Sequence, residues 1–155
     1  MDKMVECNYL STFDFVKGFV QIGLEEESRP LTAFTYDGNR YQWNRLPMGQ
    51  TSSSSQFARC MAILFQKVPF QALICYLDDI LIGSRTVEEH LKRLRFIFER
   101  LSWGGLKLST KRTQLFKKEV KFLGNLISNK GLRVDQDRIK AIQELKEPKT
   151  VKQLQ

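Results

Sequence analysis

The fold of this chain is decided by the stretch Ala72-Leu73-Ile74-Cys75-Tyr76-Leu77-Asp78-Asp79-Ile80-Leu81-Ile82-Gly83. It contains two apolar runs of strand length, and the acidic pair Asp78-Asp79 separates them. The runs are too closely joined for a helix to form between them. They therefore predict a tight β-hairpin that carries two carboxylates at its tip.

A third aspartate, Asp14, ends an earlier strand-like stretch, Tyr9–Phe15. Carboxylates that gather at a strand turn repel one another unless a cation is bound, and oxygen ligands select hard ions such as Mg²⁺ or Mn²⁺. The alternative is three solvated aspartates at loop tips. Because two of the acids interrupt an apolar hairpin without an evident structural need, the pattern favours a metal site. An acidic hairpin with a distant strand-end aspartate is the arrangement that two-metal nucleotidyl transfer requires.

The composition indicates one domain without a disulfide framework. With 155 residues and 42% hydrophobic side chains, the chain is long enough for one core. No apolar run approaches the roughly 18 residues of a membrane span, and the N-terminus lacks a signal-peptide pattern.

The uneven spacing of Cys7, Cys60 and Cys75 argues against a zinc site and favours a reducing, intracellular compartment. His90 is the only histidine, so a Ser-His triad is nearly excluded, and its charged helical surroundings predict a solvated surface position.

The positive charge is concentrated in one segment. The net charge is +8, yet residues 1–105 are neutral, with 12 basic and 12 acidic side chains. Residues 106–133 contain one acid, Glu119, and a run of basic residues: Lys107, Lys111, Arg112, Lys117, Lys118, Lys121, Lys130 and Arg133. A polyanion is the expected partner, with binding that weakens in salt. The alternative is a solubilising face.

The segment between the first strand and the acidic hairpin is predicted to form another hairpin and a helix. Asp37-Gly38 is a hairpin signal between Pro30–Tyr36 and Arg40–Leu46. The serine-rich residues 51–55 resemble a linker, but capping-box spacing at Ser53 and the apolar period that follows favour a helix entrance.

A second helix is predicted after the acidic hairpin. Thr86 and Glu89 have capping-box spacing, and Gly104-Gly105 ends the helix. Its apolar residues form one stripe at helical period: Val87, Leu91, Leu94, Phe98 and Leu101.

The remaining segment is predicted to form short strands and one more helix. The strands are expected at residues 107–109, 114–116 and 120–128, with a turn at Lys130-Gly131. Asp135 is expected to cap a helix that stops before Pro148 and carries Ile139, Ile142 and Leu145. The order of elements predicts an α+β fold in which two helices back an antiparallel sheet.

Five blocks of the sequence follow one another in a pattern shared with one known family. They are Leu10–Ile22, in which a strand-end aspartate precedes Gly-aromatic and Gln-Ile; Leu46-Pro47-Met48-Gly49 with Phe57-Ala58-Arg59; Tyr76-Leu77-Asp78-Asp79; Leu106–Lys111; and Glu119–Gly124. Together they resemble the reverse transcriptase of gypsy-type LTR retrotransposons. A Tyr-x-Asp-Asp tetrad alone is weak, whereas five ordered blocks over nearly the whole chain are specific.

The resemblance implies a polymerase palm with partial fingers over residues 1–134, including a fingers-like hairpin at about 25–50, and the start of a thumb over 135–155. Two positions depart from the family pattern: Ser54 stands in place of a common proline, and Met48-Gly49-Gln50 replaces Phe-Gly-Leu. We also expect the family's preceding fingers segment to be missing, and no ribonuclease H or integrase portion to follow.

The resemblance further implies RNA-directed DNA polymerase activity within a retrotransposon polyprotein. Asp14, Asp78 and Asp79 would hold two Mg²⁺ or Mn²⁺ ions, with Asp14 and Asp78 bridging both. The substrates would be an RNA or DNA template with a primer, and deoxynucleoside triphosphates. The other partners would be the remaining fingers, thumb and ribonuclease H segments.

Contacts with the substrates follow from the same resemblance. The nucleotide would contact Phe15, Phe19, Met48 and Gln50. Phe19 would lie beneath the sugar and exclude a 2′-hydroxyl, although an ordinary core position is the alternative. The primer and template would contact Tyr76, Leu77, Phe122, Leu123, Gly124 and Lys111. Lys111 would donate a proton to pyrophosphate, a role for which Arg112 competes, and Phe122 and Leu123 could equally be core residues.

Two further functions are open at this stage. One is a domesticated, non-catalytic module that binds nucleic acid or protein, which the missing fingers favour and the three aspartates oppose. The other is a structural subunit of a dimeric polymerase, because exposed strand edges invite pairing, including with a second copy.

Overall fold

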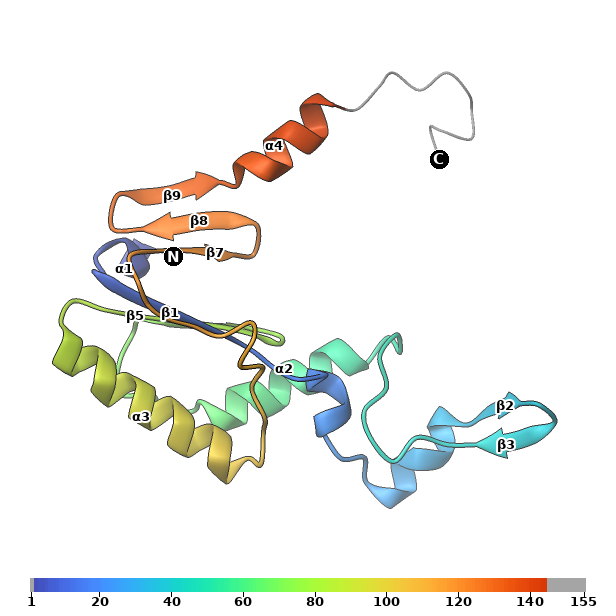
Figure 1. Ribbon diagram of the computed structural model, residues 1–155. Helices are drawn as coiled ribbons and strands as arrows, with labels where there is room; N and C mark the ends of the chain where they lie inside the picture. Colours follow the sequence, from blue (N-terminus) through green and yellow to red (C-terminus); the bar gives the residue numbers. More distant parts are fainter. Residues whose placement is uncertain (1, 145–155) are drawn as a thin grey trace.

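A central antiparallel sheet organises the computed structural model, which describes residues 2–144 (Figure 1). Its strands are β1 (Tyr9–Asp14), β4 (Leu73–Tyr76), β5 (Asp79–Ser84) and β6 (Gln114–Lys117), in the order β4-β5-β1-β6. The predicted acidic hairpin is confirmed as β4 and β5, which are joined at a two-residue turn, Leu77-Asp78. Leu77 adopts φ 50° in this turn, the left-handed conformation that such tight turns require.

The two faces of the central sheet are covered by different layers. Helices α2 (Ser53–Leu64) and α3 (Val87–Trp103) lie on one face, where Phe13 and Ile80 pack with Phe57 and Ile97. A second, three-stranded sheet lies on the other face, above β1 and β5 in Figure 1. It contains β7 (Glu119–Phe122), β8 (Asn125–Ser128) and β9 (Gly131–Val134). The α+β prediction is therefore confirmed.

A second apolar core fills the space between the two sheets. Leu10 and Leu81 from the central sheet pack there with Val120, Phe122 and Ile127. The short helix α1 (Asp2–Val5) also joins this cluster. Successive strand residues face opposite sides of the sheet, and both faces of the central sheet are covered. Successive positions are therefore apolar, which explains the continuous hydrophobic runs of the central strands.

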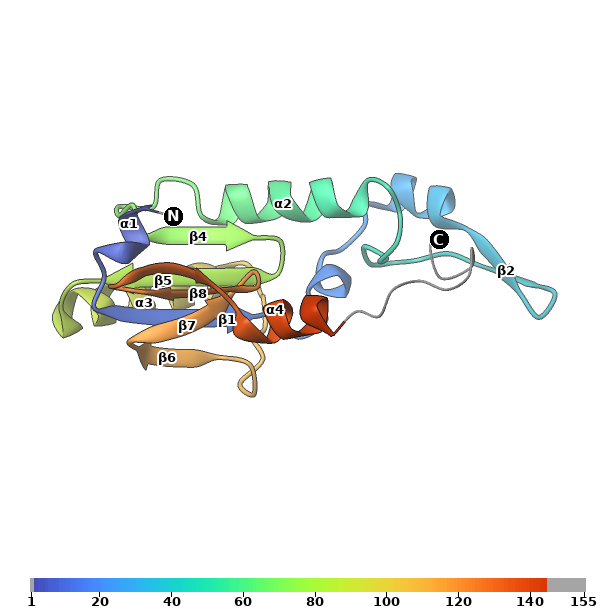
Figure 2. The same ribbon diagram turned by 90° about the horizontal axis from the view of Figure 1, so that it is seen from above.

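The Asp37-Gly38 hairpin forms but is shorter than predicted. Its strands are β2 (Phe34–Tyr36) and β3 (Asn39–Tyr41), preceded by the 3-10 helices η1 (Gly18–Gln21) and η2 (Glu26–Thr32). The residues after β3 pair elsewhere: the Leu46 amide donates to the Ile22 carbonyl, and the Leu24 amide donates to the Asn44 carbonyl. The hairpin projects away from the central sheet in both views (Figures 1 and 2).

Helix α2 begins where the serine-rich segment predicted, but its entrance differs in detail. Ser52 is the N-cap residue, and its side chain makes no capping hydrogen bond. The Ser53 hydroxyl is buried and instead donates to the Pro47 carbonyl at 2.6 Å. The predicted capping box at Ser53 is therefore wrong, because this hydroxyl holds the preceding loop rather than the helix end.

The capping prediction for α3 is confirmed, whereas its apolar stripe is partly wrong. The Thr86 hydroxyl accepts from the Glu89 amide at 3.2 Å. The buried face consists of His90, Leu94, Ile97 and Leu101. Three residues of the predicted stripe are exposed: Val87, Leu91 and Phe98. The helix carries two apolar stripes, and the one that contains His90 and Ile97 faces the sheet.

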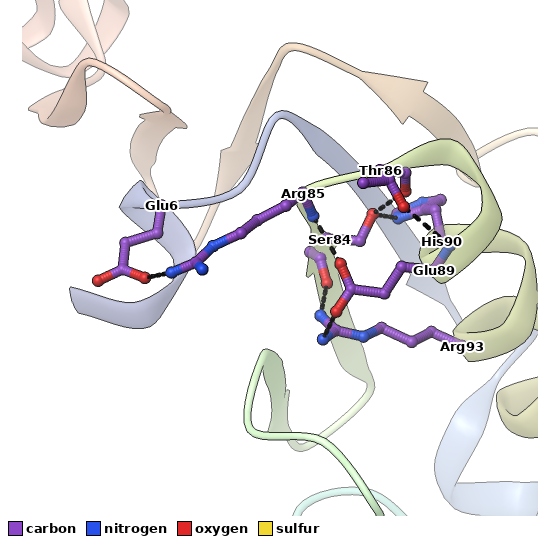
Figure 3. A network of polar contacts seen from close by, with 8 residues as sticks. Glu6, Ser84, Arg85, Thr86, Glu89, His90 and Arg93 are labelled. Carbon is purple, nitrogen blue, oxygen red and sulfur yellow. Dashed lines mark hydrogen bonds and ion pairs between the residues drawn. The ribbon is translucent and has the colours of Figure 1, made fainter.

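His90 is fully buried at 0% exposure, so its predicted surface position is wrong. Its Nδ1 lies 2.8 Å from the Ser84 Oγ (Figure 3), and its Nε2 lies 2.7 Å from the Ser11 Oγ. The Ser84 hydroxyl donates to the Thr86 carbonyl, so it accepts from Nδ1–H. The Ser11 Oγ accepts the Phe116 amide, so its own proton is available for Nε2. The ring is therefore neutral and fully hydrogen-bonded.

The last described helix, α4 (Gln136–Gln143), follows Asp135 as predicted, and the Ile139 amide donates to the Asp135 carbonyl at 3.3 Å. The predicted positions Leu145 and Pro148 lie outside the described residues, as does the side chain of Ile142. Among residues 2–144, no helix is both long and apolar enough to cross a membrane.

The buried imidazole predicts acid sensitivity. Burial, with the neighbouring Arg93 guanidinium, lowers the pKa of His90 to about 4 from 6.5. The unfolded chain binds more protons between these values, so stability should fall as the pH drops through this window, by about 2 kcal/mol at pH 5. Urea unfolding of the wild type and of His90→Gln at pH 7 and pH 5 measures this loss. The variant should be less stable at pH 7 but lose less on acidification; an equal loss in both proteins would exclude His90 as the cause.

Candidate active site

The three predicted aspartates lie at one end of the central sheet. Asp14 is paired with Asp79 in the β1–β5 register, and Asp78 occupies the adjoining turn. Residues paired across antiparallel strands project to the same face, so the carboxylates of Asp14 and Asp79 share one face of the sheet. Gly18 allows η1 to pack closely here, since a Cβ on Gly18 would lie 3.2 Å from both the Phe15 Cβ and the Phe57 ring, and 3.4 Å from the Asp78 Cβ.

These carboxylates destabilise one another in the metal-free protein. Burial raises the pKa of Asp79, and the charges of Asp78 and Asp14 raise it further. Burial also raises the pKa of Asp14, with a contribution from Asp78, whereas Arg112 acts in the opposite direction. The site therefore has an excess of negative charge that a cation would relieve.

The chemistry of these side chains fits a hard divalent ion, but their arrangement is not closed around one. The Asp14 Oδ1 is buried and has no hydrogen-bond partner, as expected of an oxygen that awaits a ligand. The Asp14 Oδ2 lies 2.8 Å from the Arg112 guanidinium. Within residues 2–144, no group of three or more His, Cys, Asp or Glu side chains is positioned to hold a metal ion. The sequence therefore predicted which carboxylates gather at this end but missed their cationic neighbour.

The Arg112 segment is joined to the β1 end through its backbone. The Ser109 amide donates to the Asp14 carbonyl at 2.8 Å, and the Val16 amide donates to the Lys107 carbonyl at 3.1 Å. The Gln21 side chain connects both segments: its amide donates to the carbonyls of Val16 and Lys107, and its oxygen accepts from the Lys107 amide. In the sequence, Gln21 stands out only as part of the Gln-Ile motif, and no local pattern indicates this connecting role.

The predicted nucleotide residues divide into two buried and two exposed positions. Phe19 is 9% exposed and its ring lies 4.9 Å from that of Phe57, whereas Phe15 is fully buried against the same ring. Met48 is 73% exposed. Gln50 lines a cavity of about 580 Å³ between the η1–η2 segment and α2. Phe15 is thus a core residue whose side chain is closed to solvent.

The residues predicted to contact primer and template also include both exposed and buried positions. Tyr76 is exposed and pairs with Asp79, so it shares the face of the aspartates. Phe122 is buried in the second core, which matches its core alternative. Leu123 and Gly124 form the β7–β8 turn with φ values of 50° and 75°. Of the remaining two residues, Leu77 lies in the acidic turn and Lys111 is exposed beside Arg112.

Residues 1–127 match the reverse transcriptase (RNA-dependent DNA polymerase) family. This chain belongs to that family. It is 34% identical over 142 residues to the Retrovirus-related Pol polyprotein from transposon 297 of Drosophila melanogaster, covering 92% of this chain and 13% of the relative. It is 31% identical over 146 residues to the corresponding polyprotein from transposon gypsy of the same organism, covering 94% of this chain and 14% of the relative. The resemblance to gypsy-type reverse transcriptases is therefore confirmed.

Solved reverse transcriptases have the same fold. The foamy viral protease–reverse transcriptase dRH in complex with double-stranded DNA superposes with a TM-score of 0.86 at 34% identity, covering 96% of this chain and 26% of that one. The same viral protein in complex with an RNA/DNA hybrid gives 0.85 at 32% identity, covering 97% and 21%. The expected palm-like fold is confirmed, and this chain spans only a small part of each relative.

The charge excess predicts that Asp79→Asn stabilises the metal-free protein at pH 7. The raised pKa of Asp79 means that ionisation opposes folding above that pKa, so the advantage of asparagine should shrink as the pH falls toward 3.8. Urea unfolding of both proteins from pH 8 to pH 4, without added metal, measures this difference. Comparing the two proteins at each pH cancels the effect of His90. A variant that is less stable than the wild type at pH 7 would contradict the destabilisation of ionised Asp79 by burial and by its acidic neighbours.

Proposed function

We propose that this chain is the catalytic part of a longer retroelement polyprotein and supports RNA-directed DNA synthesis at a primer 3′-hydroxyl. The observation that carries the proposal is the pairing of Asp14 with Asp79 beside Asp78, in a chain of the reverse transcriptase family. The proposal assigns residues 1–134 to the palm with part of the fingers, and residues 135–155 to the start of the thumb.

Reverse transcriptases in general use divalent metals, and three carboxylates are available here to hold them. In our proposal, Asp14, Asp78 and Asp79 would hold two Mg²⁺ or Mn²⁺ ions, with Asp79 as the weaker ligand. Bound there, the ions would activate the primer hydroxyl and stabilise the leaving pyrophosphate. The buried, unpartnered Asp14 Oδ1 supports this assignment.

The substrates are assigned to the surfaces next to these carboxylates. Phe19 would exclude a 2′-hydroxyl, and its ring has a rigid support because it packs on Phe57. Tyr76 lies on the aspartate face, and the backbone of the Leu123-Gly124 turn is available to hold the primer. A primer–template duplex is the proposed nucleic acid, since the matched foamy viral structures contain double-stranded DNA or an RNA/DNA hybrid.

The basic segment predicts a salt-dependent grip on that duplex. Binding should weaken linearly on a log–log plot against salt, with a slope of about −0.9 per phosphate contacted on DNA. The combined substitution Lys117→Gln, Lys118→Gln and Lys121→Gln should flatten this slope. Lys121 should contribute least, because it pairs with Asp135 at 3.0 Å. Fluorescence anisotropy from 50 to 300 mM salt provides the measurement. Lys92→Gln on α3 removes one positive charge elsewhere and is the control for each of the three single lysine variants. An unchanged slope in the triple variant would show that the basic segment is only a solubilising face.

Primer extension tests the function itself. Orientation of primer, triphosphate and metal supplies much of the rate, and the matched relatives are far longer than this chain. We therefore expect little extension by the 155 residues alone, even with Mn²⁺. Placed within a full-length relative, the chain should extend a primer, and Asp14→Asn, Asp78→Asn or Asp79→Asn should each reduce extension by at least about a hundredfold. In that chimera, Phe19→Val should admit ribonucleotides more readily.

Two outcomes would count against this function. Extension that survives loss of the aspartates would exclude them as the catalytic groups. A folded chimera that binds duplex and metal but does not extend the primer would favour a non-catalytic nucleic-acid-binding module.

A further inference from the structure

A cation of the protein itself already lies at the proposed metal site. The Arg112 guanidinium is 2.8 Å from the Asp14 Oδ2. The two side chains differ sharply in exposure, at 15% for Asp14 and 61% for Arg112. The carboxylate is therefore fixed and mostly enclosed, whereas the guanidinium reaches it from the solvent side.

The fold delivers Arg112 to this position. The segment that carries it is held to the β1 end by the Ser109 amide, which donates to the carbonyl of Asp14. A tight turn follows, in which the amides of Arg112 and Thr113 and the Thr113 hydroxyl all donate to the Ser109 carbonyl. Because this backbone is anchored, only the Arg112 side chain has to move for the ion pair to open.

We propose that Arg112 acts as a substitute cation, which neutralises Asp14 in the metal-free protein and competes with a divalent ion for that carboxylate. The inference rests on the proposed function, because it requires Asp14 to be a metal ligand. It also accounts for the open arrangement of the acidic side chains, since one oxygen of Asp14 is engaged by Arg112 and the other has no partner. Arginine keeps its charge at all working pH values, so it suits this role.

The competition is weighted toward the metal. An exposed ion pair is weak and is screened by salt, because the long side chain loses freedom and water competes for its charge. A divalent ion carries twice the charge and would be attracted by each nearby carboxylate, whereas Arg112 pairs with Asp14 alone among the ion pairs of the described residues. Arg112 should therefore limit metal affinity without preventing binding.

The test is Mn²⁺ binding to the 155-residue chain, followed by electron paramagnetic resonance of the free ion. Arg112→Gln should bind Mn²⁺ about two- to fivefold more tightly than the wild type at low salt, because the competing ion pair is gone. The advantage should shrink at high salt. Arg112→Lys should keep most of the wild-type weakness, and Arg112→Met removes the same charge if the glutamine variant does not fold. Arg95→Gln on the exposed side of α3 removes the same charge elsewhere and should leave the affinity unchanged.

The possible outcomes distinguish failure of the Arg112 competition from failure of the proposed metal site. Equal Mn²⁺ affinity in the wild type and Arg112→Gln, or weaker binding in the variant, would overturn the competition and leave the metal site standing. Failure of both proteins to bind Mn²⁺ would overturn the metal site and the competition together. Tighter binding that also requires Asp14, shown by its loss in the Asp14→Asn/Arg112→Gln double variant, would support both.

Discussion

The antiparallel pairing of β1 with β5 is the constraint on which the rest of the structure depends. Its register aligns Asp14 with Asp79 and Phe13 with Ile80. A slip of one residue would turn every side chain of one strand to the other face, which would expose apolar residues to the wrong layer and separate the two acids. The same backbone pairing therefore fixes both cores and the candidate site, and mutations that weaken the pairing would damage fold and function together.

The two ends of this strand pair differ in their electrostatics: one has a neutral, fully hydrogen-bonded network, and the other has a cluster of acidic side chains. At one end, His90 joins Ser11 of β1 to Ser84 of β5 in a buried network in which each ring nitrogen has a partner. At the other end, Asp14 and Asp79 are forced together with their pKa values raised. Fully satisfied polar networks specify a unique arrangement, whereas functional sites retain groups whose environment is unfavourable without a ligand. The His90 network thus holds the register that the repelling acids would loosen.

The sequence predicted those features that depend on neighbouring residues. The acidic hairpin, the Asp37-Gly38 turn and the end of α3 at Gly104 each follow from local turn or capping chemistry, and the structure has all three. It did not predict the burial of His90, because the serines that satisfy the ring lie on separate strands, one of them 79 residues away. Nor could the period of α3 decide which of two apolar stripes faces the sheet. The pairing of Arg112 with Asp14 could not be predicted for the same reason, since it depends on how two segments that are distant in the sequence lie together in the fold.

The contact between residues 107–109 and the end of β1 also explains how the proposed site could hold either the Arg112 guanidinium or a metal ion. The backbone bonds between residues 107–109 and the end of β1 do not involve the carboxylate of Asp14, so they persist whichever cation the carboxylate holds. Gln21 strengthens this connection because it bonds to main-chain groups of both segments. In the proposed competition, the exchange of the guanidinium for a metal ion would then be a side-chain event on a fixed backbone, so the aspartates would keep their register with either cation. Pairing with Arg112 would reduce the repulsion among the acids in the metal-free protein, while the buried Asp14 Oδ1 has no hydrogen-bond partner that a metal would have to displace.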